Sequence, residues 1–321
     1  MATTLIHVEH LSRHYGALQA VADVNFELSQ GEVLGFLGPN GAGKSTTMQM
    51  ISGNLAPSQG SVKICGIDLL EQPKLAKAEI GYLPEQPPLY RELTVDEYLT
   101  FAARINRIAK NKITSAVERA KQRCGLEEVA KRLINNLSKG YQQRVGIAQA
   151  IIHSPSIVVL DEPTVGLDPI QIREIRKLIR ELGKEHGVIL STHILPEVQM
   201  TCDHVQIINK GQLVFADKIE NLNQRMQASS LIMSVQQSPP VDMLTAIEHV
   251  TAADDLGDGR WRIHYPPENS PAAILATQAA NNNWGLYELS PEHKSLEQIF
   301  VDITTAEQPA PENTPSEEHA A

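Results

Sequence analysis

One stretch decides the fold of this 321-residue chain: Gly38-Pro39-Asn40-Gly41-Ala42-Gly43-Lys44-Ser45-Thr46. It fits the phosphate-loop pattern G-x-x-x-x-G-K-[ST], whose glycines let backbone N–H groups curl around an anion. Lys44 brings a positive charge to the β- and γ-phosphates of a nucleotide, and Ser45 offers a hydroxyl to Mg²⁺. Residues 32–37 predict a short buried strand before the loop, and residues 45–51 predict a helix after it. The sequence therefore predicts a phosphate site at a helix N-terminus, where free N–H groups favour anions.

Composition limits the class of protein. The net charge is −10 and 42% of the residues are hydrophobic, which is typical of a packed globular protein without general affinity for nucleic acid. The three cysteines lie far apart and predict neither a disulfide framework nor a zinc site, which favours a reducing cytosol. No secretion signal and no apolar stretch of about 20 residues is visible, so we expect another chain to supply any membrane spans. A basic run at helical spacing is interpreted as a solvated helix face and contains Lys110, Lys112, Arg119, Lys121 and Arg123.

Hydrophobic periodicity predicts an α/β fold. Residues 5–11 and 21–28 alternate as half-buried strands do, which indicates an antiparallel β layer at the start. Tyr15 lies between them on a predicted turn, where the residues alone favour a packing role over adenine binding. The predicted domains are a nucleotide-binding domain over 1–221 with a helical subdomain over about 90–152, an α+β domain over 222–303 and a disordered tail over 304–321.

Acidic residues follow a second buried strand. Residues 156–160 form a continuous apolar run, as in a central parallel strand, and Asp161 and Glu162 come directly after it. The carboxyl ends of such strands are where α/β proteins place ligand chemistry. A further predicted strand, residues 188–192, precedes His193. We therefore expect these side chains to gather at one edge of the sheet.

Two loops add candidate ligand contacts. Prolines 84, 87 and 88 predict a loop with a fixed course, because they remove hydrogen-bond donors and restrict their neighbours, and this loop contains Glu85 and Gln86. Ser138 is predicted to cap a helix whose first turn Gly140 leaves open to a ligand.

In this order, the motifs resemble the nucleotide-binding domain of ATP-binding-cassette (ABC) transporters over about residues 5–220. Residues 137–141 correspond to the family's signature motif, whose plain form is LSGGQ, and depart from it at Lys139 and Tyr141. This variant resembles the signature of exporter ATPases of the drug-resistance, polysaccharide and gliding-motility type. The matching segments are Walker A at 38–46, the signature at 137–141, Walker B at 157–164, the D-loop at 165–169 and the switch histidine at 190–193.

The resemblance implies a P-loop NTPase core with an antiparallel β subdomain, the inserted helical subdomain and an accessory C-terminal domain. It implies ATP and Mg²⁺ as cofactors, and it gives Tyr15 the role of adenine platform. The implied metal ligands are Ser45, Asp161 and Glu85.

The implied catalytic residues act on the terminal phosphate. Lys44 holds the phosphates, Glu162 is the general base, and His193 contacts the γ-phosphate. In the proline-rich loop, alignment with the family favours Glu85 over Gln86 as the metal-facing side chain. The alternative is that both residues only solvate a loop.

The resemblance also implies partners and a location. The chain is expected to hydrolyse ATP to energise transport, in the direction of export, through separate membrane-spanning permease subunits. A second ATPase subunit, in a homodimer, is expected to offer its Ser138 and Gly140 to the ATP held by the first, and no nucleic acid partner is expected. The implied location is cytoplasmic, peripheral on the inner face of the cell membrane.

Two other classes remain open from the residues. One is a soluble ABC ATPase that acts on ribosomes or DNA, although such proteins usually carry two cassettes or a coiled-coil insertion. The other is a P-loop small-molecule kinase, which requires neither the signature nor the D-loop.

Overall fold

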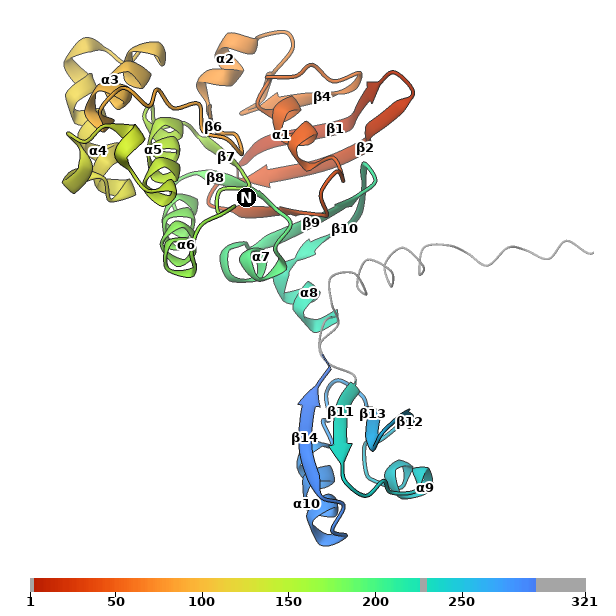
Figure 1. Ribbon diagram of the computed structural model, residues 1–321. Coiled ribbons are helices and arrows are strands. Elements are labelled where there is room, and N and C mark those ends of the chain that lie inside the picture. Colours follow the sequence, from red (N-terminus) through yellow and green to blue (C-terminus); the bar gives the residue numbers. More distant parts are fainter. Residues whose placement is uncertain (1–2, 226–229, 293–321) are drawn as a thin grey trace, which may run out of the picture. The chain divides into compact units, whose positions relative to one another are not determined.

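The structure is a computed structural model that describes residues 3–225 and 230–292. These residues form two compact units, with the boundary between Ile219 and Glu220, and each unit has its own hydrophobic core (Figure 1). The tail predicted over 304–321 and the end of the predicted α+β domain lie outside the described residues.

The first unit is built on a six-stranded sheet of order β10-β9-β3-β8-β7-β6. All its neighbouring strands are parallel except the hairpin of β9 and β10. Strands β3, β7 and β8 are buried along their whole length, as the apolar runs predict. The strands are β3 (Val33–Leu37), β6 (Ile80–Leu83), β7 (Ile157–Asp161), β8 (Gly187–Thr192), β9 (His204–Asn209) and β10 (Gln212–Lys218).

A second, antiparallel sheet has the order β2-β1-β4-β5, which confirms the predicted antiparallel layer. One hydrophobic core joins the two sheets, and the ring centroids of Phe26 on β2 and Phe36 on β3 lie 5.9 Å apart. Tyr15 is the last residue of β1 and not a turn residue, because Gly16 and Ala17 form the turn. The strands are β1 (Thr4–Tyr15), β2 (Leu18–Ser29), β4 (Gln59–Ile64) and β5 (Ile67–Asp68).

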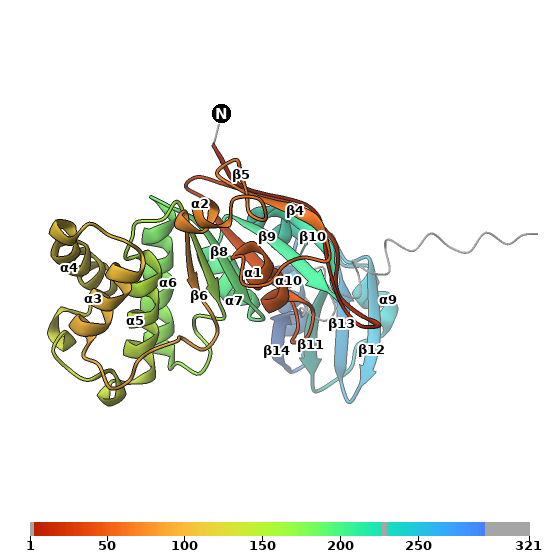
Figure 2. The ribbon, with the colours of Figure 1, turned by 90° about the horizontal axis from the view of Figure 1, so that it is seen from above.

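The helical subdomain contains α3 (Val95–Ile105), α4 (Ile113–Cys124) and α5 (Lys139–Ile151), with 3-10 turns η1 (Lys110–Lys112), η2 (Glu127–Val129) and η3 (Ile134–Asn136) between them. Figures 1 and 2 both place α3 and α4 at the edge of the first unit that lies away from β1 and β2. Thr94 and Glu97 form the capping box that starts α3: the Thr94 N–H donates to Glu97 Oε2 at 2.8 Å, and the Glu97 N–H donates to Thr94 Oγ1 at 3.3 Å.

Four other helices connect the strands of the first unit, and a fifth, α8, follows its last strand. Helix α6 begins at Pro169, after Asp168 accepts hydrogen bonds from two N–H groups of the first turn. Helices α7 and α8 have no counterpart in the sequence-based prediction. The five are α1 (Lys44–Ile51), α2 (Pro73–Ala78), α6 (Pro169–Gly183), α7 (Leu195–Thr201) and α8 (Ile219–Arg225), the last of which crosses the boundary between the units.

Over residues 230–292, the second unit is a four-stranded antiparallel sheet of order β12-β13-β11-β14 with the helices α9 and α10. Its core contains both tryptophans of the chain, Trp261 and Trp284, each 5% exposed. The edge strand β12 was not predicted. The elements are β11 (Ser230–Val235), α9 (Val241–Thr245), β12 (Ala252–Gly257), β13 (Arg260–His264), α10 (Ala272–Asn281) and β14 (Leu286–Pro291). Within the described ranges, none of the helices has the length and apolar character needed to span a membrane.

Candidate functional site

The phosphate loop connects β3 to α1, as its sequence predicts. Gly43 has a φ of 109°, and a Cβ there would lie 2.6 Å from the carbonyl oxygen of Ala20, so only glycine fits. Lys44 is 5% exposed, and its Nζ donates to the carbonyl oxygens of Gly38 at 2.9 Å and Pro39 at 3.2 Å. The loop is therefore closed around its own lysine at the N-terminus of a helix.

A cavity of about 380 Å³ opens at this loop. The loop and the segments that follow β6, β7 and β8 meet there, because parallel strands end at the same edge of the sheet. Val165 of the D-loop also lines it, as does Ala20, which the sequence analysis did not name. The predicted site residues that line the cavity are Asn40, Gly41, Gly43, Lys44, Ser45, Thr46, Glu85, Glu162 and His193.

Asp161 lies at the end of β7, beside the loop. Its Oδ1 accepts hydrogen bonds from the hydroxyl of Ser191 and, at 3.4 Å, from that of Ser45. Burial raises the pKa of the Asp161 carboxyl; the two hydroxyls lower it, and the nearby Glu85 carboxylate raises it again, with a raised pKa as the result. Carboxylate and hydroxyl oxygens are the ligands of hard cations, so this group of side chains fits Mg²⁺ chemically.

Glu162 contacts both Lys44 and His193. Its Oε1 lies 3.3 Å from Lys44 Nζ, and its Oε2 lies 2.9 Å from His193 Nδ1. Since a carboxylate only accepts hydrogen bonds, Nδ1 of the imidazole is the donor. Glu162 also has a left-handed backbone, with φ 47°, which is uncommon for a residue other than glycine. A buried carboxylate is thus held at the cavity wall between two groups that can carry positive charge.

Glu197 is a residue of this region that the sequence analysis missed. It is fully buried on α7 and accepts hydrogen bonds from the hydroxyls of Thr164 and, at 2.7 Å, Thr192. Arg176 Nη2 lies 3.6 Å from the same carboxylate. Glu197 therefore ties the segment after Glu162 to the segment before the switch histidine. The sequence offered one signal for Glu197, an acid that stands between apolar residues in Leu195-Pro196-Glu197-Val198.

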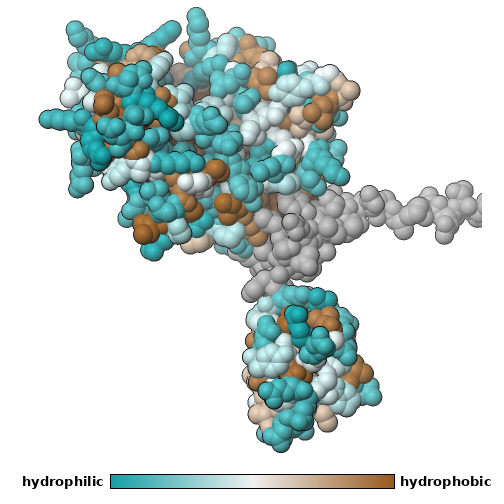
Figure 3. All heavy atoms as spheres, viewed as in Figure 1, coloured by the Kyte–Doolittle hydropathy of each residue, from teal (hydrophilic) through white to brown (hydrophobic). Residues whose placement is uncertain are grey.

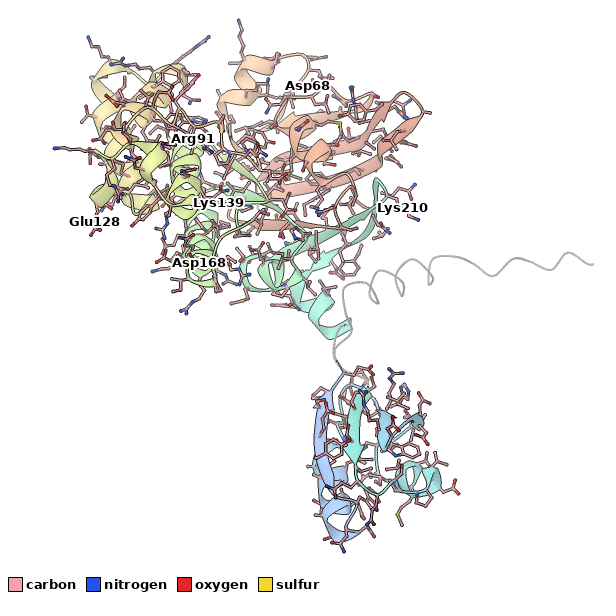
Figure 4. All side chains as sticks on the ribbon, viewed as in Figure 1. Asp68, Arg91, Glu128, Lys139, Asp168 and Lys210 are labelled. Carbon is pink, nitrogen blue, oxygen red and sulfur yellow. The ribbon has the colours of Figure 1, made fainter. Side chains whose placement is uncertain are left out.

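The signature lies at the start of α5 and does not line the 380 Å³ cavity. Ser138 caps α5 by accepting a hydrogen bond from the Tyr141 N–H at 3.4 Å, as predicted. A Cβ on Gly140 would lie 2.4 Å from Oε1 of Gln171 on α6. Figure 4 labels Lys139 at this helix start and Asp168 at the start of α6. Ser138 and Gly140 are therefore apart from the phosphate loop of their own chain.

Tyr15 is also apart from the cavity lining. Its side chain is 45% exposed, and the guanidinium carbon of Arg13 lies 4.8 Å from the ring centroid. A cation thus occupies one face of the ring. The other face is where a base would stack, so the adenine role of Tyr15 stays a prediction.

In the proline-rich loop, the neighbouring residues Glu85 and Gln86 differ in the cavities that they line. Glu85 lines the phosphate cavity, whereas both residues line a second cavity of about 580 Å³ that also contains Arg91 and Lys139. The carboxylate of Glu85 is close enough to affect the pKa of Asp161. This arrangement supports the prediction that Glu85 faces the metal.

We expect Glu85→Ala to raise the Mg²⁺ concentration needed for half-maximal ATP hydrolysis by about tenfold, because an oxygen near the metal is lost. Gln86→Ala is the matched control, with an expected change of less than about twofold, since Gln86 does not line the phosphate cavity. A Mg²⁺ titration of each variant measures this. If only Gln86→Ala raises the requirement, the assignment is wrong by one residue.

Fold and site together define a P-loop ATPase with a helical subdomain between its phosphate loop and β7, the strand that ends in Asp161. A sequence profile described as "ABC transporter" matches residues 21–165. The bacitracin transport ATP-binding protein BcrA of Bacillus licheniformis is 39% identical over 303 residues, which cover 94% of this chain and 97% of BcrA. The chain therefore belongs to the ATP-binding subunits of ABC transporters, and the family predicted from the motifs is confirmed.

Two further comparisons agree. The linearmycin resistance ATP-binding protein LnrL of Bacillus subtilis (strain 168) is 29% identical over 306 residues, with 94% of this chain and 98% of LnrL covered. The dimeric post-hydrolysis structure of the cassette MJ0796 bound to ADP and Pi has a TM-score of 0.61 and 25% identity, covering 67% of this chain and 99% of that one. This protein is thus an ATP-binding and ATP-hydrolysing subunit with the predicted P-loop NTPase fold.

Proposed function

We propose that the chain is the ATPase subunit of an exporter, acts as a homodimer on membrane-spanning permease subunits, and works at the cytoplasmic face of the cell membrane. The observation that carries the ATPase part is the cavity where Lys44, Ser45, Glu85, Glu162 and His193 meet. Export is supported by similarity over nearly the whole chain, second unit included, to proteins of bacitracin transport and linearmycin resistance.

In this proposal the loop binds phosphate through backbone N–H groups and Lys44 Nζ. Glu162 accepts the proton of the attacking water at a carboxylate oxygen. The imidazole of His193, anchored through Nδ1 to Glu162, presents Nε2 toward the terminal phosphate and donates from it when protonated. The left-handed backbone at Glu162 fixes where the base points, which fits a group that must be preorganised.

We propose Mg²⁺ as the metal, held by Ser45, Asp161 and Glu85. The fit rests on the hydroxyl and carboxylate oxygens that gather beside the loop, where Ser45 donates to Asp161, because such oxygens are the ligands of hard cations. When bound, the ion neutralises charge on the phosphates during phosphoryl transfer. The chain's own contribution is to hold Asp161 in place through Ser191.

The composite site is a further part of the proposal. Ser138 and Gly140 lie outside the phosphate cavity of their own chain, which supports a role for them at the ATP of the other subunit. Free N–H groups at the start of α5 suit a phosphate in that arrangement. We also propose two domains, which the two compact units support: an ATPase domain over 1–221, with its helical subdomain over about 90–152, and an accessory domain over 222–303.

Mixing Lys44→Ala protein with Ser138→Arg protein tests the head-to-tail pair. Each variant alone is expected to be nearly inactive. Random pairing makes about half of the dimers mixed, and each mixed dimer has one intact site of two, so about a quarter of the wild-type rate is expected. ATP hydrolysis at increasing ratios of the two variants measures the recovery. A mixture that never exceeds its components would contradict the composite site.

Two alternative functions were left open by the sequence, and the observations support neither. A ribosome- or DNA-directed ATPase is disfavoured by the net charge of −10 and by similarity to transport proteins over 94% of the chain. A small-molecule kinase would need an acceptor, so hydrolysis of ATP without any added acceptor separates that class from the proposed one.

A further inference from the structure

The end of α3 and the turn to α4 carry an unusual charge pattern. Between Glu97 and Glu118 the sequence has no acidic residue, although the chain as a whole has a net charge of −10. The same interval holds four basic residues that are all exposed, and none of their side chains forms an ion pair with any residue that the structure describes. We call the following five residues the basic tip: Arg104, Ile105, Arg107, Lys110 and Lys112.

Arg107 ends helix α3 with a left-handed backbone. Helix α3 ends here: the Arg107 N–H donates to the Arg104 carbonyl at 3.0 Å, and the Ile108 N–H donates to the Ala103 carbonyl at 3.1 Å. Arg107 has a φ of 57°, in the left-handed region where helices usually end on glycine. Glycine would be less strained at this position. Replacing Arg107 with glycine therefore removes its charge without adding backbone strain.

Ile105 adds an apolar side chain between the charges. It is 62% exposed and does not line the neighbouring groove of about 720 Å³ between α3 and α4. Two carboxylates, on Asp96 and Glu118, line that groove together with Arg104 and Lys110. Both carboxylates pair with Lys121, at 2.6 and 2.8 Å. The predicted solvated basic face is therefore wrong for Lys121, which is 5% exposed, because the lysine is buried between two acids. The four cations of the tip therefore have no ion-pair partner among the residues that the structure describes.

We propose that the basic tip contacts the anionic phospholipid headgroups of the membrane that holds the permease. Lys and Arg near such a surface are attracted by its negative potential, and an exposed aliphatic side chain can enter the interface between them. Arg104 and Lys110 line the groove, whereas Ile105, Arg107 and Lys112 do not, so the tip as a whole suits a surface better than a peptide confined to the groove. Figure 3 shows the helical subdomain, at the upper left, as mostly hydrophilic with small hydrophobic patches.

The contact goes beyond the proposed function and does not involve the ATP site. It would hold the helical subdomain near the membrane in addition to whatever the permease contributes. Because the attraction is electrostatic, it is expected to weaken as salt shortens the distance over which charges interact.

Arg107→Gly gives a sharp test, because it removes the charge while relieving the backbone. The matched control is Lys210→Gly: Lys210 is exposed, has a φ of 47° and lies in the turn between β9 and β10, outside the helical subdomain (Figure 4). Cosedimentation with phosphatidylglycerol vesicles and with phosphatidylcholine vesicles measures binding of the purified full-length chain. Arg107→Gly is expected to lower partitioning onto phosphatidylglycerol about fivefold, and Lys210→Gly to leave it unchanged.

Two further variants separate lipid binding from folding and from catalysis. The combination R104Q/R107G/K110Q/K112Q is expected to reduce binding to the level seen with phosphatidylcholine, and Ile105→Ser to weaken it at constant charge. Thermal midpoints at or above the wild-type value for Arg107→Gly, with unchanged ATP hydrolysis, would exclude a folding defect. Failure of the ATPase proposal would appear in hydrolysis and leave vesicle binding intact.

Three outcomes would overturn the proposal. The wild-type chain binds both kinds of vesicle equally or binds neither; Lys210→Gly loses as much binding as Arg107→Gly; or the fourfold variant keeps vesicle binding but no longer copurifies with the permease. The last result would make the basic tip a protein contact.

Discussion

Replacing Glu162 with glutamine is expected to slow ATP hydrolysis by a factor of about 10² to 10⁴, while ATP still binds. Glutamine keeps the size of the side chain and can still accept a hydrogen bond from His193 Nδ1, but it cannot take a proton from water. Binding persists because the phosphates are held by the loop and Lys44, and removing a negative charge 3.3 Å from Lys44 Nζ leaves the lysine free for them.

Phosphate release and the affinity for a fluorescent ATP analogue measure the two effects separately. Glu181→Gln is a suitable control, since Glu181 is an exposed acid whose oxygen lies 3.9 Å from Lys177 on α6, far from the cavity lining. Its rate is expected to stay near that of the wild type. Near-normal hydrolysis by Glu162→Gln would remove Glu162 from the role of base. Loss of ATP binding would instead assign it to the positioning of Lys44.

Replacing Glu197 with alanine is expected to lower the free energy of unfolding of the first unit by about 3 kcal/mol. The change removes the acceptor for two buried hydroxyls, on Thr164 and Thr192, and leaves the half-buried Arg176 without its carboxylate. Unsatisfied buried donors and an uncompensated charge are among the largest sources of destabilisation.

Urea unfolding followed by circular dichroism measures this loss. Glu197→Gln keeps one acceptor oxygen and is expected to be intermediate, which preserves the test if the alanine variant does not fold. Glu181→Ala, which breaks only an exposed pair, is expected to change stability by less than about 0.5 kcal/mol. Equal midpoints for Glu197→Ala and the wild type would show that the buried contacts contribute nothing measurable.

Glu162 was predicted from the sequence and Glu197 was not, and the difference has a physical reason. Glu162 stands next to Asp161 at the end of an apolar run, so a contiguous pattern predicts both the strand and the position of the acid. Glu197 acts through Thr164, which is 33 residues away, and it sits on the seven-residue helix α7, too short for a clear periodic pattern. Local motifs predicted the catalytic edge of the sheet; the contacts that brace it depend on tertiary structure.

The edge strand β12 was not predicted from the sequence, for a different reason. Its residues 252–257 include Asp254 and Asp255 and end in glycine, all of which are rare in strands. The strand forms because it pairs with β13, where Asp255 lies opposite Trp261 and His264 Nε2 lies 2.8 Å from Asp254. Pairing with a well-formed neighbour overrides weak propensity, and a single sequence does not reveal that neighbour.

The burial of both tryptophans in the second unit gives the chain an intrinsic optical reporter. Trp261 and Trp284 are the only two in the sequence, and both lie in the core of the second unit. Indole fluorescence therefore follows the second unit alone, whereas circular dichroism follows both. The two melting transitions can be separated in the intact protein without any label. A shift in the emission spectrum on adding ATP would measure directly how strongly the catalytic unit communicates with the unit that follows it.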